Sequence, residues 1–112
     1  MMAASELSKK TCRACQGKPR ALDDAEAQNF LAQLPGWERT GGEIAKTFSF
    51  KNYYETLAFV NASAWVSHRE DHHPDLEVGF NKCKVRYSTH SVGGLSENDF
   101  ICAAKIEMLS KL

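Results

Sequence analysis

Three segments of the chain space their apolar residues as amphipathic α-helices do. The first segment begins at Asp23, which has a glutamate three residues later in a capping-box pattern, and it ends at Pro35-Gly36. The second begins at Asn52 and ends before Pro74, because proline disfavours helical geometry at the preceding residue. The third begins at Ser96 and continues almost to the C-terminus. The pattern therefore predicts three helices separated by two stretches of other structure.

Between these helices, apolar and polar residues alternate with the period of two that is typical of β-strands. Residues 37–39 and 44–50 flank a Thr-Gly-Gly-Glu turn, which predicts a first hairpin. Residues 76–80 and 83–88 flank Asn81-Lys82 and predict a second hairpin. Its first strand is expected to bury one face, made of Leu76, Val78 and Phe80. The predicted fold class is α+β, in the order α-β-β-α-β-β-α: a four-stranded antiparallel sheet with three helices packed on one face.

The second helix is apolar over an unusually wide arc. One side carries Leu57, Val60, Ala64 and either Trp65 or Ser67, and another carries Phe59, Ala62 and Val66. A helix of this kind is usually covered from two sides, which suggests a contact with a second subunit.

The chain has 112 residues, which is the size of one domain. Residues 1–20 are polar and basic and contain Gly17 and Pro19 as breakers, so we expect a flexible N-terminal tail. Residues 21–112 are expected to form a single domain.

The charge balance excludes several classes of partner. Fourteen basic and fourteen acidic residues give a formal net charge of zero, so nothing indicates binding to nucleic acid or to an anionic membrane. No apolar run approaches the ~20 residues that span a bilayer. Residues 1–10 are polar and lack the apolar segment of a secretory signal, which predicts a cytoplasmic protein.

Four cysteines are present, and free thiols are their expected state in a reducing compartment. Cys12 and Cys15 have the spacing of half a zinc site or of a redox pair. A closed zinc site needs four ligands, and no second ligand pair lies near them in the sequence, so we expect neither a metal nor a redox role. Cys83 and Cys102 occupy apolar positions of a strand and a helix and are expected to be core residues.

All four histidines lie between residues 68 and 90. His72 and His73 occupy the turn where the second helix gives way to a strand, and His90 follows the last strand of the next hairpin. Because a hairpin folds back on itself, its two ends are neighbours, and these histidines are expected to lie close together. Asp99, in the first turn of the last helix, is placed to join them across the Gly93-Gly94 loop.

Three interpretations fit such a cluster. Imidazoles are common metal ligands, and His68 with His72 has helical ligand spacing, although adjacent ligands such as His72 and His73 rarely bind one ion. The histidines could instead make ordinary hydrogen bonds at the ends of elements. The third interpretation is metal-free acid–base catalysis, since an imidazole can donate and accept protons near neutral pH.

The same segment resembles the pterin-4a-carbinolamine dehydratase family. The resemblance rests on His72-His73-Pro74-Asp75, Asn81-Lys82, Ser88-Thr89-His90, Gly94-Leu95-Ser96-Glu97 and Asp99, over about thirty residues without gaps. It extends more loosely from Pro35-Gly36-Trp37 to the C-terminus, and the Cys12–Cys15 tail is similar to that of bacterial members. The chain departs from the family at His68, where glutamate is frequent.

The resemblance implies a four-stranded antiparallel sheet with three helices on one face, assembled into a homodimer or homotetramer. It implies the dehydration of 4a-hydroxytetrahydrobiopterin to quinonoid dihydrobiopterin and water, with no cofactor and no metal. Such a reaction would regenerate the cofactor of an aromatic amino acid hydroxylase.

Roles for individual residues follow as a hypothesis from this resemblance. His72 and His90 would carry out the proton transfers, and His73 would mainly orient the pterin. Asp99 would hydrogen-bond a histidine and fix its tautomer. These four residues are the catalytic candidates, and the pterin-binding candidates are Asp71, His73, Ser88, Thr89 and Ser91.

A second class of function also follows from the resemblance. Animal members of the family act as dimerisation cofactors of a homeodomain transcription factor. The alternative is therefore a protein-binding coactivator module with a vestigial catalytic site. The clustered histidines favour the enzyme, because a binding helix has no use for three of them.

Overall fold

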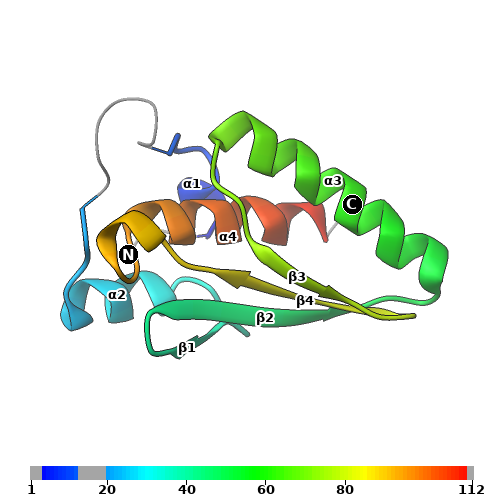
Figure 1. Ribbon diagram of the computed structural model, residues 1–112, viewed down its shortest axis with the longest axis horizontal. Coiled ribbons are helices and arrows are strands. Elements are labelled where there is room, and N and C mark those ends of the chain that lie inside the picture. Colours follow the sequence, from blue (N-terminus) through cyan, green and yellow to red (C-terminus); the bar gives the residue numbers. More distant parts are fainter. Residues whose placement is uncertain (1–3, 13–19, 111–112) are drawn as a thin grey trace.

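The computed structural model describes residues 4–12 and 20–110, with side chains from Glu6 onward. The polypeptide combines one antiparallel sheet with α-helices, which is the predicted α+β class (Figure 1). Its elements are α1 (Ala4–Leu7), α2 (Asp24–Leu31), β1 (Glu38–Thr40), β2 (Glu43–Ser49), α3 (Tyr53–Glu70), β3 (Asp75–Val78), β4 (Lys82–Tyr87), the 3-10 helix η1 (His90–Val92) and α4 (Glu97–Leu109). The predicted order α-β-β-α-β-β-α is confirmed for α2 to α4, and the short α1 precedes it.

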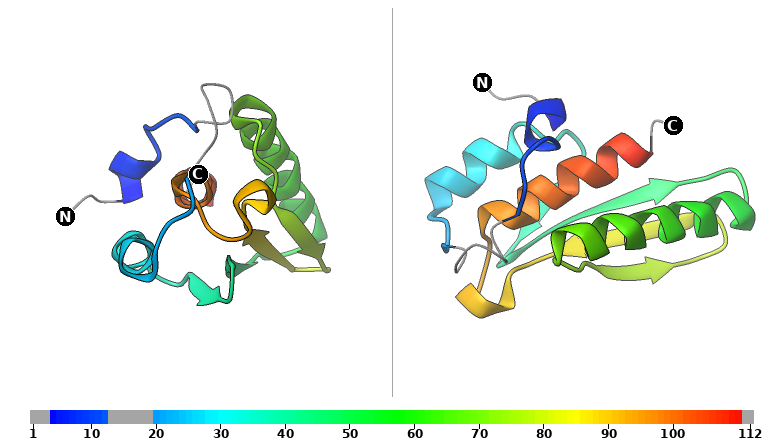
Figure 2. Two further views of the ribbon diagram at one scale, coloured as in Figure 1. Left: turned by 60° about the vertical axis from the view of Figure 1, so that its left-hand side comes forward. Right: turned by 90° about the horizontal axis from the view of Figure 1, so that it is seen from above.

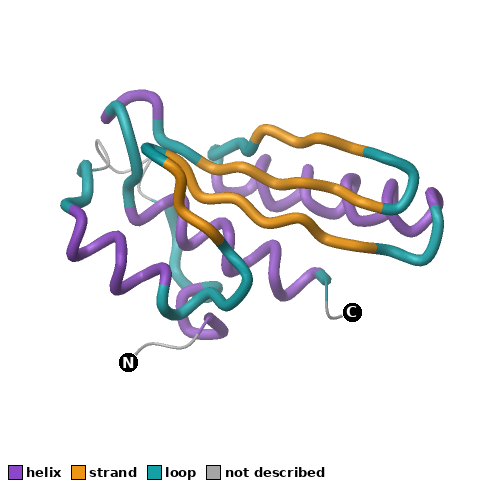
Figure 3. Tube along the Cα trace, turned by 90° about the horizontal axis from the view of Figure 1, so that it is seen from below, coloured by secondary structure: helices purple, strands orange, loops and turns teal. Residues whose placement is uncertain are grey.

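The four strands form one antiparallel sheet in the order β1-β2-β4-β3, so the two hairpins meet through β2 and β4 (Figure 3). Helices α2, α3 and α4 cover one face of this sheet, as predicted (Figure 2). The covered face buries every second residue of the central strands, namely Ile44, Phe48, Cys83, Val85 and Tyr87. Helix α4 lies between α2 and α3 (Figure 2), and its residues from Asn98 to Ala104 are all buried.

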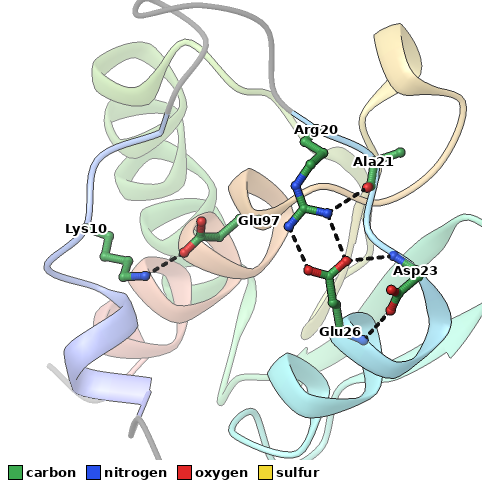
Figure 4. A network of polar contacts seen from close by, with 6 residues as sticks. All are labelled: Lys10, Arg20, Ala21, Asp23, Glu26 and Glu97. Atoms are coloured by element: carbon green, nitrogen blue, oxygen red, sulfur yellow. Dashed lines mark hydrogen bonds and ion pairs between the residues drawn. The ribbon is translucent and has the colours of Figure 1, made fainter.

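The predicted helix starts are confirmed by their caps. The Asp23 carboxylate accepts the Glu26 backbone N–H at 2.8 Å, and Glu26 in turn accepts the Asp23 N–H at 3.1 Å. Arg20 pairs with the same glutamate (Figure 4), and this hydrogen bond lowers the pKa of Glu26 to about 2. Asn52 caps α3 by accepting the Glu55 N–H at 2.9 Å. Ser96 is the N-cap of α4.

Helix α3 buries a different side from the one that its aliphatic residues suggest. Its buried residues are Thr56, Phe59, Ser63, Ser67 and Glu70. These positions recur every three or four residues, so they form one stripe of the helix. Small serines allow the helix to approach the sheet and α4, and their hydroxyls bond to carbonyls of the preceding turn. Phe59 is buried and Val60 and Val66 pack against the core, whereas Trp65 is 63% exposed, so the predicted apolar arc is only partly covered within the described chain.

The prediction that Leu76, Val78 and Phe80 share a buried face is wrong for the last two residues. Val78 is 43% exposed and Phe80 is 68% exposed, and β3 ends at Val78. The physical reason is position, since β3 is an edge strand with a neighbour on one side only. Phe80 instead stacks on Tyr53 at the start of α3, with ring centroids 6.5 Å apart.

The N-terminal segment that the sequence assigned to a tail contains α1 and makes core contacts. Leu7 is 0% exposed and Cys12 is 3% exposed. Helix α1 packs on α4, and the Lys10 ammonium pairs with Glu97 in the first turn of α4 (Figure 4). Residues 13–19, including Cys15, lie outside the described part of the chain.

Lys46 interrupts the apolar face of β2, and the structure shows which group neutralises its charge. Its ammonium pairs with the carboxylate of Glu107 on α4, and the Trp37 indole N–H donates to the same oxygen at 3.0 Å. The side chains of Lys46 and Glu107 are 24% and 11% exposed. The carboxylate therefore accepts from two donors, and the Lys46 ammonium also donates to the Pro35 carbonyl at 3.5 Å.

Glu107→Ala is expected to lower the free energy of unfolding by about 2 kcal/mol, because it leaves a largely buried indole N–H without an acceptor and removes the counter-charge of the Lys46 ammonium. The Glu107→Gln variant keeps an acceptor for Trp37 and should lose about half as much. Urea unfolding of the three proteins measures both differences. An alanine variant as stable as the wild type would show that these bonds contribute nothing.

Candidate active site

The end of α3 aims His72 back toward the core. The helix ends at Glu70, and Asp71 follows in the left-handed conformation with φ of 51°. The backbone N–H of His72 still donates to the Ser67 carbonyl at 3.3 Å, which closes the last turn. Pro74 prevents any continuation of the helix, as predicted. The His72 side chain is 11% exposed as a result, so most of the ring is enclosed.

The enclosed ring meets a buried carboxylate. His72 Nε2 lies 2.6 Å from Oδ1 of Asp99, and Asp99 is 0% exposed. The other carboxylate oxygen, Oδ2, accepts the Thr89 hydroxyl at 2.8 Å and the Ser96 backbone N–H at 2.9 Å. Three donors thus converge on one carboxylate in the first turn of α4, where the helix dipole also favours a negative charge.

This arrangement sets the tautomer of His72. A carboxylate only accepts hydrogen bonds, so Nε2 of His72 must carry the proton of the contact with Asp99. The second ring nitrogen, Nδ1, is then the one left to take or give a proton. Nδ1 is therefore the ring atom through which His72 could exchange a proton with a bound molecule.

Tyr87 holds the ring of His72 from one side. The two rings are nearly parallel, at 8°, with centroids 5.8 Å apart. Tyr87 is itself fully buried at the end of β4, and burial raises the pKa of its phenol well above the usual range. The tyrosine therefore forms a neutral, rigid wall beside His72 at physiological pH.

The Ser88-Thr89-His90 segment lies beside a surface hollow. This hollow has a volume of about 320 Å³ and is lined by Ser88, Thr89, His90, the Gly93-Gly94 loop and the Gly42-Glu43 turn. The two loops meet closely here, because a Cβ atom on Gly42 would lie 3.2 Å from the Gly94 Cα. Thr89 thus has its hydroxyl on Asp99 while its segment borders the hollow.

The structure joins some of the sequence-predicted residues by hydrogen bonds and leaves others exposed. His72, Thr89 and Asp99 form one hydrogen-bonded group, and Ser88 and His90 adjoin it through Thr89. His73, Asp71 and Ser91 are exposed, as is His90. Within the described residues, no hydrogen bond joins these exposed histidines to Asp99, and no group of three or more potential ligands is placed to hold a metal ion.

Two members of the group were not predicted. Tyr87 was expected only as a core residue of a strand, and nothing in its spacing indicates a stack with a histidine fifteen residues earlier. Ser96 was expected only as a helix cap, yet its hydroxyl lies 2.8 Å from that of Thr89. The capping-box pattern pointed to the contact between Ser96 and Asp99, but it does not indicate that the same carboxylate also binds Thr89 and His72.

Comparison with known proteins places this chain in a family. The model of the family described as pterin 4 alpha carbinolamine dehydratase matches residues 20–109. A relative in Nitrosospira multiformis, provisionally named a pterin-4-alpha-carbinolamine dehydratase, is 58% identical over 96% of this chain and 95% of its own length. A relative in Dechloromonas aromatica with the same provisional name is 51% identical over the whole of both chains. The chain belongs to the pterin-4a-carbinolamine dehydratase family, as the sequence motifs predicted.

Solved structures agree with this assignment. A crystal structure from Brucella melitensis, described as a transcriptional coactivator/pterin dehydratase, superimposes with a TM-score of 0.79 at 28% identity, over 81% of this chain and 99% of that one. A pterin dehydratase-like protein described as a RuBisCO assembly factor of the alpha-carboxysome shares the fold alone, with a TM-score of 0.56 at 24% identity. No helix in the described ranges has the length and hydropathy to cross a membrane.

Proposed function

We propose that this protein dehydrates 4a-hydroxytetrahydrobiopterin to quinonoid dihydrobiopterin and water by metal-free histidine acid–base catalysis. The observation that carries the proposal is the 2.6 Å contact between His72 Nε2 and the fully buried carboxylate of Asp99. A buried carboxylate that holds one histidine nitrogen is typical of catalytic imidazoles, because it orients the ring and stabilises its protonated form. Family membership and the provisional names of the relatives support the substrate class.

The reaction needs two proton transfers. The hydroxyl on C4a leaves as water only when a general acid protonates it, and N5 must lose its proton to form the new C4a–N5 double bond. The enclosed His72 and the exposed His90 lie on segments that Thr89 and Asp99 tie together. One histidine would then give a proton to the hydroxyl while the other takes the proton of N5.

The remaining candidates would bind the pterin. A pterin edge presents donors and acceptors as an amide does, so backbone groups and hydroxyls suit it. Ser88 and Thr89 border the hollow, while Asp71, His73 and Ser91 provide polar groups on the neighbouring exposed turns. His73 would orient the ring without transferring a proton.

The wider setting is part of the same proposal. The protein would act in the cytoplasm as a homodimer or homotetramer and recycle the pterin cofactor of an aromatic amino acid hydroxylase. Exposed aromatic residues on α3, namely Tyr53, Tyr54 and Trp65, support a subunit contact. The Brucella melitensis relative is also described as a coactivator, so a protein-binding role with an idle site is the alternative.

One assay tests the proposal and separates it from the alternative. The purified full chain is mixed with enzymatically generated carbinolamine, and the quinonoid product is followed by absorbance, with and without a chelator. We expect a rate well above the spontaneous one in both conditions, because histidines alone supply the proton transfers. A rate equal to the spontaneous one would refute the enzyme, and loss of activity with chelator that zinc restores would refute the metal-free mechanism.

A further inference from the structure

The N-terminal segment packs on the domain, and one of its contacts joins two cysteines. Cys12 Sγ lies 3.4 Å from Cys102 Sγ on α4, and both side chains are buried. The family match begins at residue 20, so Cys12 belongs to a segment that precedes the family domain, whereas Cys102 lies within it. The sulfur contact therefore bridges the domain and a part of the chain outside it.

The geometry suits a covalent bond between the two sulfurs. A disulfide has sulfurs about 2.05 Å apart, so the pair must approach by a little over an ångström, which side-chain rotation and a small movement of the segment can supply. Among the described cysteines, Cys83 on β4 is the third, and its sulfur has no cysteine beside it. The arrangement is thus selective for one pair.

The same segment spans the two helices that carry the candidate site. The Cys12 backbone N–H donates to the carboxylate of Glu70 at 2.9 Å, two residues before His72. On the other side, Cys12 touches Cys102, three residues after Asp99 and hence one helical turn away. Residues 8–12 therefore connect the end of α3, which precedes His72, with the second turn of α4, which follows Asp99.

Besides the buried Leu7 of α1 and the contact of Cys12 Sγ with the Asn98 carbonyl at 3.8 Å, residues 8–12 have polar anchors. Lys105 donates to the Ser8 carbonyl at 2.6 Å, and Lys10 pairs with Glu97 through side chains that are 40% and 28% exposed. Partly exposed ion pairs contribute little to stability. A segment held in this way can open locally without unfolding the domain, which gives a small reagent access to Cys12.

We propose that Cys12 and Cys102 form a redox pair, and that a disulfide between them, made by exchange with a small disulfide of the glutathione type, locks residues 8–12 onto α4. In the closed segment the Cys102 thiol is unreactive, because the hydrogen bond with Cys12 and burial both raise its pKa, and the Cys12 thiol is buried. Opening is therefore the step that admits the oxidant.

The exchange balances in two steps. The Cys12 thiolate attacks one sulfur of oxidised glutathione, breaks its disulfide bond and releases one glutathione thiolate. When the segment closes, the Cys102 thiolate attacks the Cys12 sulfur of the mixed disulfide and displaces the second glutathione. The two cysteines are oxidised by two electrons, one oxidised glutathione is reduced to two thiols, and two protons leave with the products.

The test treats the full-length native protein with oxidised glutathione and maps the disulfides by mass spectrometry after digestion with trypsin under non-reducing conditions. The sequence places the four cysteines in four different tryptic peptides, so each possible pair has its own mass. We expect the intact protein to lose about 2 Da and to yield a cross-link between residues 11–13 and 87–105. The Tm of the oxidised protein should rise by at least about 5 °C, since the bond closes a long loop.

Matched variants make the result specific. Cys83→Ser should leave the cross-link unchanged, and Cys15→Ser should also leave it unchanged. Cys12→Ser and Cys102→Ser should each abolish the cross-link. Cys12→Ser leaves the buried Cys102 of α4 unchanged. A cross-link between Cys12 and Cys15, a glutathione adduct that never resolves, or a fully reduced protein would each overturn the proposal. These readouts do not depend on dehydratase activity, so their outcome is independent of the proposed function.

Discussion

His72→Ala is expected to reduce kcat for carbinolamine dehydration by about 100- to 10,000-fold, the contribution typical of a positioned acid or base. The reason is that the imidazole is the group that the buried Asp99 orients, at 2.6 Å. Its removal leaves that carboxylate without one of its three donors. Stopped-flow measurement of product formation, with the spontaneous rate subtracted, gives the ratio to wild type.

The companion variant is His90→Ala, for which we expect a loss of at least about 100-fold, since a dehydration needs both an acid and a base. The control is His68→Ala, which removes an exposed imidazole on the same helix as His72 and should change kcat by less than about twofold. If His72→Ala and His90→Ala both keep nearly wild-type turnover, the assignment of the proton-transfer groups is wrong. Far-UV circular dichroism of each variant shows whether the fold is retained.

The helix starts and the strand pairing could be predicted from the sequence because they depend on local chemistry. Asp23, Asn52 and Ser96 cap helices through side-chain and backbone contacts with residues three positions away. Such short-range pairs are visible in the sequence itself. The two hairpins likewise follow from turns and alternation, and their meeting through β2 and β4 leaves each of the other strands at an edge.

The burial of α3 and β3 could not be predicted in this way, because it depends on which neighbours surround an element. The aliphatic residues of α3 suggested its inner side, but Ser63 and Ser67 lie there, since small side chains fit the close approach to other elements. Phe80 alternates correctly for a buried position, yet the edge of the sheet leaves it exposed. Periodicity alone cannot tell an edge strand from a central one.

In the candidate site, too, some contacts could be predicted from the sequence and others depend on tertiary neighbours. The sequence predicted that Asp99 would join the histidines and hydrogen-bond one of them, and the structure shows that this histidine is His72. It also predicted that His73 and His90 would lie near His72; both are exposed, and within the described residues neither is hydrogen-bonded to Asp99. The stack of Tyr87 on His72 depends on the register of β4 against the helices, which local spacing does not encode.

Asp99→Asn is expected to lower kcat by about 100-fold or more while the fold is kept. The asparagine oxygen can take the place of Oδ2 and continue to accept from Thr89 and Ser96, which preserves the start of α4. The amide nitrogen then faces His72 Nε2 and donates to it. The proton of the neutral imidazole must move to Nδ1, so this nitrogen can no longer accept a proton from the substrate. The protonated ring also loses the negative charge of its partner.

The tautomer can be measured independently of activity. Nitrogen-15 NMR of labelled histidine distinguishes a protonated Nε2 from a protonated Nδ1, and we expect His72 to carry its proton on Nε2 in the wild type and on Nδ1 in Asp99→Asn. Thr89→Val removes another donor to the same carboxylate without touching the histidine, so it should leave the tautomer unchanged and lower kcat less. An asparagine variant that reverses the tautomer but retains full activity would show that Asp99 orients His72 for the fold and not for catalysis. That outcome would separate the structural contact from the chemistry, because both variants keep the imidazole itself.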